Sequence, residues 1–204
     1  RMTPFIRFKI AEAHFHNGDM LEAQTRFQDI ASSTKNPEIS ETALFYAARS
    51  ALKVGGENSD ADAEVFLNTI IEKEGSFYRD AKLLLARSQI NRHPEKALDT
   101  LTSLLNPETS FLLDAHMLAA EAHRELGEPS NLVAALKIYD RILTRPDTAY
   151  SLSNRLFFLK GQIFEDLKKS REALEAYYHV VQRDNLAEGK APSCLLYTSP
   201  SPRD

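Results

Sequence analysis

Residues 161–180 read GQIFEDLKKSREALEAYYHV, and the spacing of small and bulky residues in this stretch decides the fold. Ala173, Tyr177 and Val180 are separated by four and then three residues, so they lie on one face of a helix. Gly161 lies on the helical stretch before them. Because small residues at matched positions let two helices approach closely, the stretch predicts a pair of packed helices.

The same spacing recurs along the chain, at intervals of 34 to 40 residues. Each copy has a small residue, a bulky apolar residue four later and an aliphatic residue three after that: Ala23/Phe27/Ile30, Ala63/Leu67/Ile70, Ala97/Leu101/Leu104, Ala135/Tyr139/Ile142 and Ala173/Tyr177/Val180. A small residue precedes each trio on an earlier helical stretch: Ala11, Ala48, Ala86, Ala120 and Gly161. Regular recurrence at this interval is the signature of a repeat protein.

Helix-end signals divide the chain into ten helices and leave no stretch with the alternation of a strand. We expect helices at about 3–16, 20–33, 38–54, 60–73, 77–91, 94–105, 109–126, 131–145, 148–168 and 170–184. Glycines fall where the apolar periodicity stops, at Gly18, Gly55-Gly56, Gly75 and Gly127. The expected N-cap residues are Asp19, Asp60, Ser76, Thr109 and Ser130.

This pattern resembles the tetratricopeptide repeat (TPR) family. The best-matching units carry Gly161-Gln162-Ile163-Phe164 followed by Glu172-Ala173-Leu174-Glu175-Ala176-Tyr177, and Ala11-Glu12-Ala13-His14 followed by Gly18-Asp19, Glu22-Ala23 and Phe27. No unit has the family's tryptophan, and several are longer than its norm of about 34 residues, so the array is divergent. A paired-helix solenoid outside the family is the alternative.

The resemblance implies an all-α fold, an α-solenoid of about five antiparallel helix pairs wound as a right-handed superhelix. The units are expected at about 1–36, 37–75, 76–107, 108–147 and 148–193, in one array over residues 1–193. The chain begins with Arg1 ahead of Met2, and we expect truncation at both ends. Residues 194–204 resemble a translated sequencing adapter and are expected to be a non-native, disordered tail.

In the resembled family the first helix of each pair lines a concave groove. The position three before the small contact residue would point into it, and here it is apolar throughout: Phe8, Phe45, Leu83, Met117 and Phe158. Four residues further on, the same face carries Glu12, Arg49, Arg87, Glu121 and Gln162. An apolar floor beside two arginines would suit an extended or helical peptide that carries carboxylates.

Other interpretations of these residues remain open. The apolar residues could be ordinary core, and Arg49 and Arg87 could be solvated or paired with Glu12 and Glu121. The family's clamp for a terminal carboxylate needs Lys and Asn together, and Lys53 and Asn91 do not reproduce it.

The chain offers no motif for catalysis, metal binding or a cofactor. It has 7 Gly and 1 Cys, and that cysteine is Cys194 in the suspect tail. The six histidines lack metal-ligand spacing, and His14 and His123 occupy a position where the family has an aromatic, so we interpret them as packing residues. The formal net charge of −4 gives no general attraction to nucleic acid or to anionic membranes.

The function predicted from the sequence is a non-catalytic scaffold that binds a protein or peptide partner in the groove. The alternative is a helical docking or regulatory arm of a larger enzyme or of a bacterial envelope-assembly protein. No run of residues is apolar enough for a membrane span. Cytoplasmic and periplasmic locations both stay open, because a leader would precede Arg1, and the oligomeric state is left undetermined.

Overall fold

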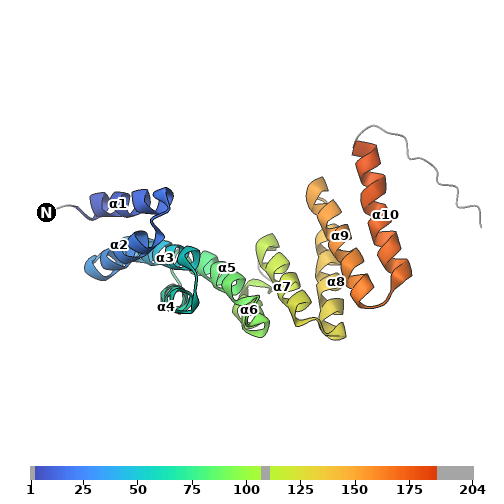
Figure 1. The fold of residues 1–204 in the computed structure, drawn as a ribbon, viewed down its shortest axis with the longest axis horizontal. Helices are drawn as coiled ribbons and strands as arrows, with labels where there is room; N and C mark the ends of the chain where they lie inside the picture. The colour runs from blue at the N-terminus through green and yellow to red at the C-terminus, as the bar shows by residue number, and fades with distance from the viewer. Residues whose placement is uncertain (1–2, 107–110, 188–204) are drawn as a thin grey trace, which may run out of the picture. The chain divides into compact units, whose positions relative to one another are not determined.

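The computed structural model describes residues 3–106 and 111–187, and within these ranges it contains ten α-helices, one short 3₁₀ helix and no strand (Figure 1). The helices are α1 Pro4–Asn17, α2 Met20–Ser33, α3 Pro37–Val54, α4 Glu57–Lys73, α5 Tyr78–Gln89, α6 Pro94–Leu101, η1 Thr102–Leu104, α7 Leu113–Leu126, α8 Pro129–Leu143, α9 Tyr150–Asp166 and α10 Ser170–Ala187. The all-α solenoid class expected from the sequence is confirmed.

Helix ends differ from the expected ones in a few places. Helix α4 begins at Glu57, three residues earlier than expected, because Gly55 and Gly56 have φ values of +73° and +93° and end the preceding helix at that point. Helix α6 passes into the 3₁₀ turn η1 before residue 105. Helix α7 begins at Leu113; the expected start at 109, with Thr109, lies outside the described residues.

Of the expected N-cap residues, only Asp19 occupies that position among the described residues. Asp60 and Ser130 lie inside α4 and α8, and Ser76 is one residue too early for α5. Thr3 and Asn36 cap the helices that directly follow them: Thr3 accepts from the Ile6 amide, and Asn36 accepts from the Glu38 and Ile39 amides.

Contacts divide the described residues into two compact units, the first ending at Gly127 and the second beginning at Glu128. In the first unit each helix from α1 to α7 packs against the next one along the chain. In the second unit α8 packs on α9, and α9 packs on α10. Neighbour-to-neighbour packing of this kind is how helical repeats share one core.

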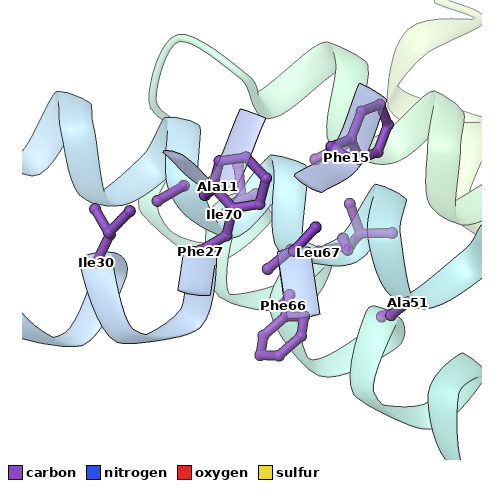
Figure 2. Packing of buried hydrophobic residues seen from close by; sticks show 14 of the residues in the cluster. Ala11, Phe15, Phe27, Ile30, Ala51, Phe66, Leu67 and Ile70 are labelled. Carbon is purple, nitrogen blue, oxygen red and sulfur yellow. The ribbon is translucent and has the colours of Figure 1, made fainter. Parts of the chain in front are cut away.

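The small residues identified in the sequence are buried in both units. The five alanines of the trios are at most 3% exposed: Ala23, Ala63, Ala97, Ala135 and Ala173. Ala11, Ala48, Ala86, Ala120 and Gly161 on the first helices are also buried. Figure 2 shows the resulting core in the first unit, where side chains from successive helices meet, including Ala11, Phe27, Leu67 and Ile70.

Gly161 illustrates why the contact residue must be small. A Cβ placed on Gly161 would lie 2.3 Å from the ring of Tyr177 on α10. The Tyr177 hydroxyl donates a hydrogen bond to Glu165, at 2.9 Å, which holds the ring over the glycine. The helix pair α9–α10 therefore closes through a glycine–aromatic contact.

Candidate protein-binding surface

The apolar first-helix positions retain accessible surface in both units. Phe8, Phe45, Leu83 and Met117 are half-buried, and Phe158 is 49% exposed. None of these side chains is as completely buried as the alanines of the trios, although all five are apolar. We refer to the five as the apolar column.

Part of the apolar column also supports the core. The Phe8 ring lies edge-on to Phe27 and Tyr46, with centroid distances of 5.2 and 5.8 Å. The ring centroid of Phe45 lies 4.9 Å from that of Phe77, the residue just before α5. Both residues therefore contribute to the core and also keep part of their surface accessible.

The polar residues that follow the apolar column have varied surroundings. Glu12 forms an ion pair with Lys9 at 2.6 Å rather than with Arg49. Arg87 and Glu121 are exposed, and Gln162 is half-buried. Within the described ranges, no carboxylate forms an ion pair with Arg49 or Arg87.

Arg49 instead belongs to a group of cations and rings on α1 and α3. Its guanidinium carbon lies 5.2 Å from the ring centroids of both Phe15 and Tyr46. Lys53, one turn further along α3, places its ammonium 4.3 Å from the centroid of Phe15. We call Phe15, Tyr46, Arg49 and Lys53 the aromatic–cation cluster.

The sequence interpretation identified Arg49 but missed the other members of this cluster as a group. Phe15 is buried and was not among the expected groove residues, and Tyr46 lies next to Phe45 on α3. A usable signal was present, since Arg49 and Lys53 are four residues apart and share one face. Asn91, the other residue compared with the family's clamp, is exposed beyond the end of α5.

Outside the apolar column, Tyr78, Lys82 and Ser103 form a cluster in which a lysine lies beside a serine, as in some nucleophilic active sites. The Lys82 ammonium donates to the Ser103 hydroxyl at 2.7 Å, and hydrogen bonds from Lys82 and Ser103 lower the pKa of Tyr78. A charged ammonium that donates to a hydroxyl does not act as a base toward it, so this geometry does not activate a serine nucleophile.

The histidines correct one sequence expectation. His14 is not a buried packing residue: its side chain is 31% exposed and lies 3.2 Å from the Asp19 carboxylate. Hydrogen bonds from Asn17 and His14 lower the pKa of Asp19. His123 is half-buried, whereas His116 is buried and stacks on Phe111 at 4.1 Å.

Residues 3–106 and 111–187 contain neither a metal-binding cluster nor a membrane-spanning helix. No group of three or more His, Cys, Asp or Glu side chains there is arranged to hold a metal ion. None of the helices combines the length and the apolar character that a membrane crossing requires.

The described residues also line two surface hollows. One is lined by Glu74, Gly75, Ser76, Tyr78, Arg79 and Asp80. The other is lined by Glu57, Asp60, Ala61, Glu64, Ser88, Gln89, Arg92 and His93, and an Arg92–Asp60 ion pair of 2.6 Å crosses it. Their polar linings resemble ordinary surface rather than an apolar ligand pocket.

Comparison with known proteins identifies the fold. No protein-family model and no curated protein matches the sequence. Among solved structures, a crystal structure of MamA protein matches with a TM-score of 0.69 at 15% identity, covering 92% of this chain and 96% of that one. A second MamA crystal structure matches with a TM-score of 0.65 at 16% identity, over 88% and 97% of the two chains.

A third match is the crystal structure of BtubC (BKLC) from P. vanneervenii, with a TM-score of 0.62 at 15% identity, covering 95% of this chain and 84% of that one. At such low identity the likeness concerns backbone architecture. The chain therefore has a helical-repeat fold, and its function has to be argued from its own surface.

Proposed function

We propose that this chain is a non-catalytic protein-interaction scaffold of the TPR type that binds a peptide segment along its first helices. In each unit the proposed surface consists of the apolar column and the polar residues one turn beyond it: Phe8, Glu12, Phe45, Arg49, Leu83, Arg87, Met117 and Glu121 in the first unit, and Phe158 and Gln162 in the second. The observation that carries the proposal is the placement of Arg49 against the rings of Phe15 and Tyr46.

Ring contacts suit Arg49 to recognise a carboxylate. Stacking on aromatic rings occupies the face of a guanidinium, whereas its N–H groups lie in the plane and can bind a carboxylate through two hydrogen bonds. Holding the arginine against rings also reduces the rotamer freedom that it would lose on binding. The half-buried Phe8 and Phe45 supply apolar surface on α1 and α3.

A peptide that alternates acidic and large apolar residues is the ligand class that this surface fits. Its apolar side chains would contact the apolar column, and its carboxylates would bind Arg49 and Arg87. Fluorescence anisotropy with a labelled peptide of alternating Glu and Leu tests this directly, with a peptide of alternating Lys and Leu as the charge control.

The matched variants are two double charge reversals. Arg49→Glu/Arg87→Glu should weaken binding of the acidic peptide at least about tenfold, which corresponds to about 1.4 kcal/mol. Lys96→Glu/Lys137→Glu changes the net charge equally, on exposed positions of the second helices α6 and α8, and should leave the affinity unchanged. Circular dichroism should show equal helicity in both variants.

Two results would contradict the proposal. One is equal affinity for the acidic and the basic peptide. The other is an equal loss of affinity in the two double variants, which would indicate attraction to net charge rather than binding at the first helices.

A further inference from the structure

The outer face of α10 carries an exposed apolar stripe. Leu174, Tyr178 and Val181 are separated by four and three residues, so they share one side of the helix. Leu174 and Val181 are each 54% exposed, and Tyr178 is 45% exposed. The buried side of the same helix, with Ala173 and Ala176, packs against α9.

Earlier second helices use the positions equivalent to Leu174 and Val181 to hold the next hairpin, whereas the position of Tyr178 is exposed in each of them, at Gln28, Asn68, Thr102 and Asp140. In α2 the equivalents of Leu174 and Val181 are Gln24 and Ala31. Gln24 is buried and donates to Asp62 of α4 at 3.0 Å, and the Ala31 carbonyl accepts from the Ser40 hydroxyl of α3 at 3.0 Å. This side of a second helix is therefore one half of a seam between hairpins.

In the other second helices, the residue equivalent to Leu174 is at least partly buried wherever it is apolar. Leu136 of α8 is buried and Leu98 of α6 is half-buried, whereas the polar Glu64 of α4 is exposed. Seven residues further along the chain, the equivalents of Val181 are all half-buried: Ala31, Ile71, Leu105 and Leu143. Leu174 and Val181 thus occupy seam positions but lie exposed.

The first helices supply the other half of each seam. The position five before the small contact residue is completely buried in four of them, at Ala43, Ala81, Ala115 and Leu156. In α1 the same position is Ile6, which is 46% exposed. Ile10 and Ala13 lie four and seven residues after Ile6, on the same side of α1, and they are half-buried and exposed.

We propose that a second copy of this chain covers the α10 stripe, with its α1 seated on Leu174 and Val181. Each copy carries both halves of the contact, one on α10 and the other at Ile6, Ile10 and Ala13 of α1. This contact between α10 and α1 of two copies would have the same arrangement as the seam between α2 and α3 inside one chain. This inference is independent of the peptide-binding surface.

Such a contact joins two different surfaces, so it is heterologous. Each added copy leaves one surface of each kind free, and the assembly keeps growing unless the copies close into a ring. Association should therefore grow with concentration beyond a dimer. One hairpin seam is small compared with a stable interface, so the association should be weak.

Sedimentation velocity of the full chain from about 5 to 500 µM tests the proposal, because this range brackets weak association. The wild type should show a weight-average mass that rises past twice that of the monomer. Leu174→Glu/Val181→Glu blocks one face and Ile6→Glu blocks the other, and each variant alone should remain a monomer. Val65→Glu, at a 62% exposed position of α4 outside both faces, is the matched control and should associate like the wild type.

Mixing the two blocked variants is the decisive measurement. The α10-blocked variant still has a free α1 face, and the α1-blocked variant still has a free α10 face, so an equimolar mixture should form a 1:1 dimer and nothing larger. Circular dichroism confirms that each variant retains its helices.

Three outcomes would overturn the proposal. The wild type could remain monomeric throughout, which would mean that another occupant, or none, covers the stripe. One blocked variant could still associate, which would indicate a symmetric contact. The mixture of folded variants could remain monomeric, which would show that α1 and α10 do not meet.

Discussion

Small side chains at the helix crossings set how closely paired helices approach each other. Gly161 and the alanines of the trios are buried, and larger residues of the partner helices pack around them. In a close-packed interior an added methyl group has to displace a neighbour, so these positions should be sensitive to volume.

Gly161→Ala should destabilise the chain by about 1–3 kcal/mol, because its Cβ would meet the Tyr177 ring. Alanine is otherwise the better helix former by about 1 kcal/mol, so any net loss reports the clash. Urea unfolding followed by circular dichroism gives the difference. In a Tyr177→Leu background the same change should be neutral or stabilising, and equal destabilisation in both backgrounds would refute the contact.

Ala97→Leu and Ala173→Leu should each lower the free energy of unfolding by about 1–3 kcal/mol through overpacking. Both alanines are buried against a neighbouring helix. Ala61→Leu on the exposed side of α4 is the control, expected within about 0.5 kcal/mol of the wild type. Thermal or urea unfolding of all three variants decides whether the assigned helix register is correct.

The sequence identified these contact residues because their spacing is local. The trio Ala23, Phe27 and Ile30 lies on one helix, and its periodicity alone predicts a buried face. The helix-start prediction was poorer, since Asp60 and Ser130 have good capping side chains but lie inside helices. In the case of Asp60 the backbone of Gly55 and Gly56 ends the preceding helix and lets α4 begin earlier.

At the level of helices, Glu41 joins two neighbouring hairpins. Its carboxylate on α3 accepts hydrogen bonds from the amides of Phe77, at 2.8 Å, and Ser76, at 3.2 Å, at the start of α5. Helix α5 has no side-chain cap of its own. The negative charge also lies where the helix dipole favours it.

Glu41→Ala should therefore lower the free energy of unfolding by about 0.5–2 kcal/mol, the usual range for losing an N-cap. Glu41→Gln keeps one acceptor oxygen and should lie between the alanine variant and the wild type. Glu64→Ala, on the exposed side of α4, removes the same charge without a cap and serves as the control in urea unfolding. If Glu41→Ala and Glu64→Ala unfold alike, Glu41 does not cap α5.

The sequence did not predict this cap or the aromatic–cation cluster. Glu41 and Phe77 are far apart in the chain, and their meeting depends on how one hairpin stacks on the next. Arg49 was recognised as a surface cation, but its contact with Phe15 depends on the α1–α3 packing. Periodicity predicts which side of a helix is buried, and only coordinates show which residues of another helix lie against it.

For the whole molecule, stability should vary along the chain because each helix packs mainly on its neighbours in sequence. Helix α3 lies between α2 and α4 and buries five residues, whereas α1 and α10 each expose a seam face. Local opening should therefore require less free energy at α1 and α10 than at α3.

Amide hydrogen exchange at low protein concentration should show α1 and α10 exchanging at least about tenfold faster than α3, a difference of about 1.4 kcal/mol in opening free energy. Raising the protein concentration should slow exchange in α1 and α10 together if copies associate through these helices. Uniform protection of all three helices would show that the chain opens as a single cooperative unit.

The turn at Gly55 and Gly56 has a practical consequence. Both glycines have positive φ, and no atom lies within 4 Å of where a Cβ on either would be. The helices on each side are held by buried residues within them, such as Ala47 and Ala51 on α3 and Ala63 and Leu67 on α4. A short epitope or a fluorophore-bearing segment grafted between the two glycines would therefore extend into solvent and leave the neighbouring hairpins assembled.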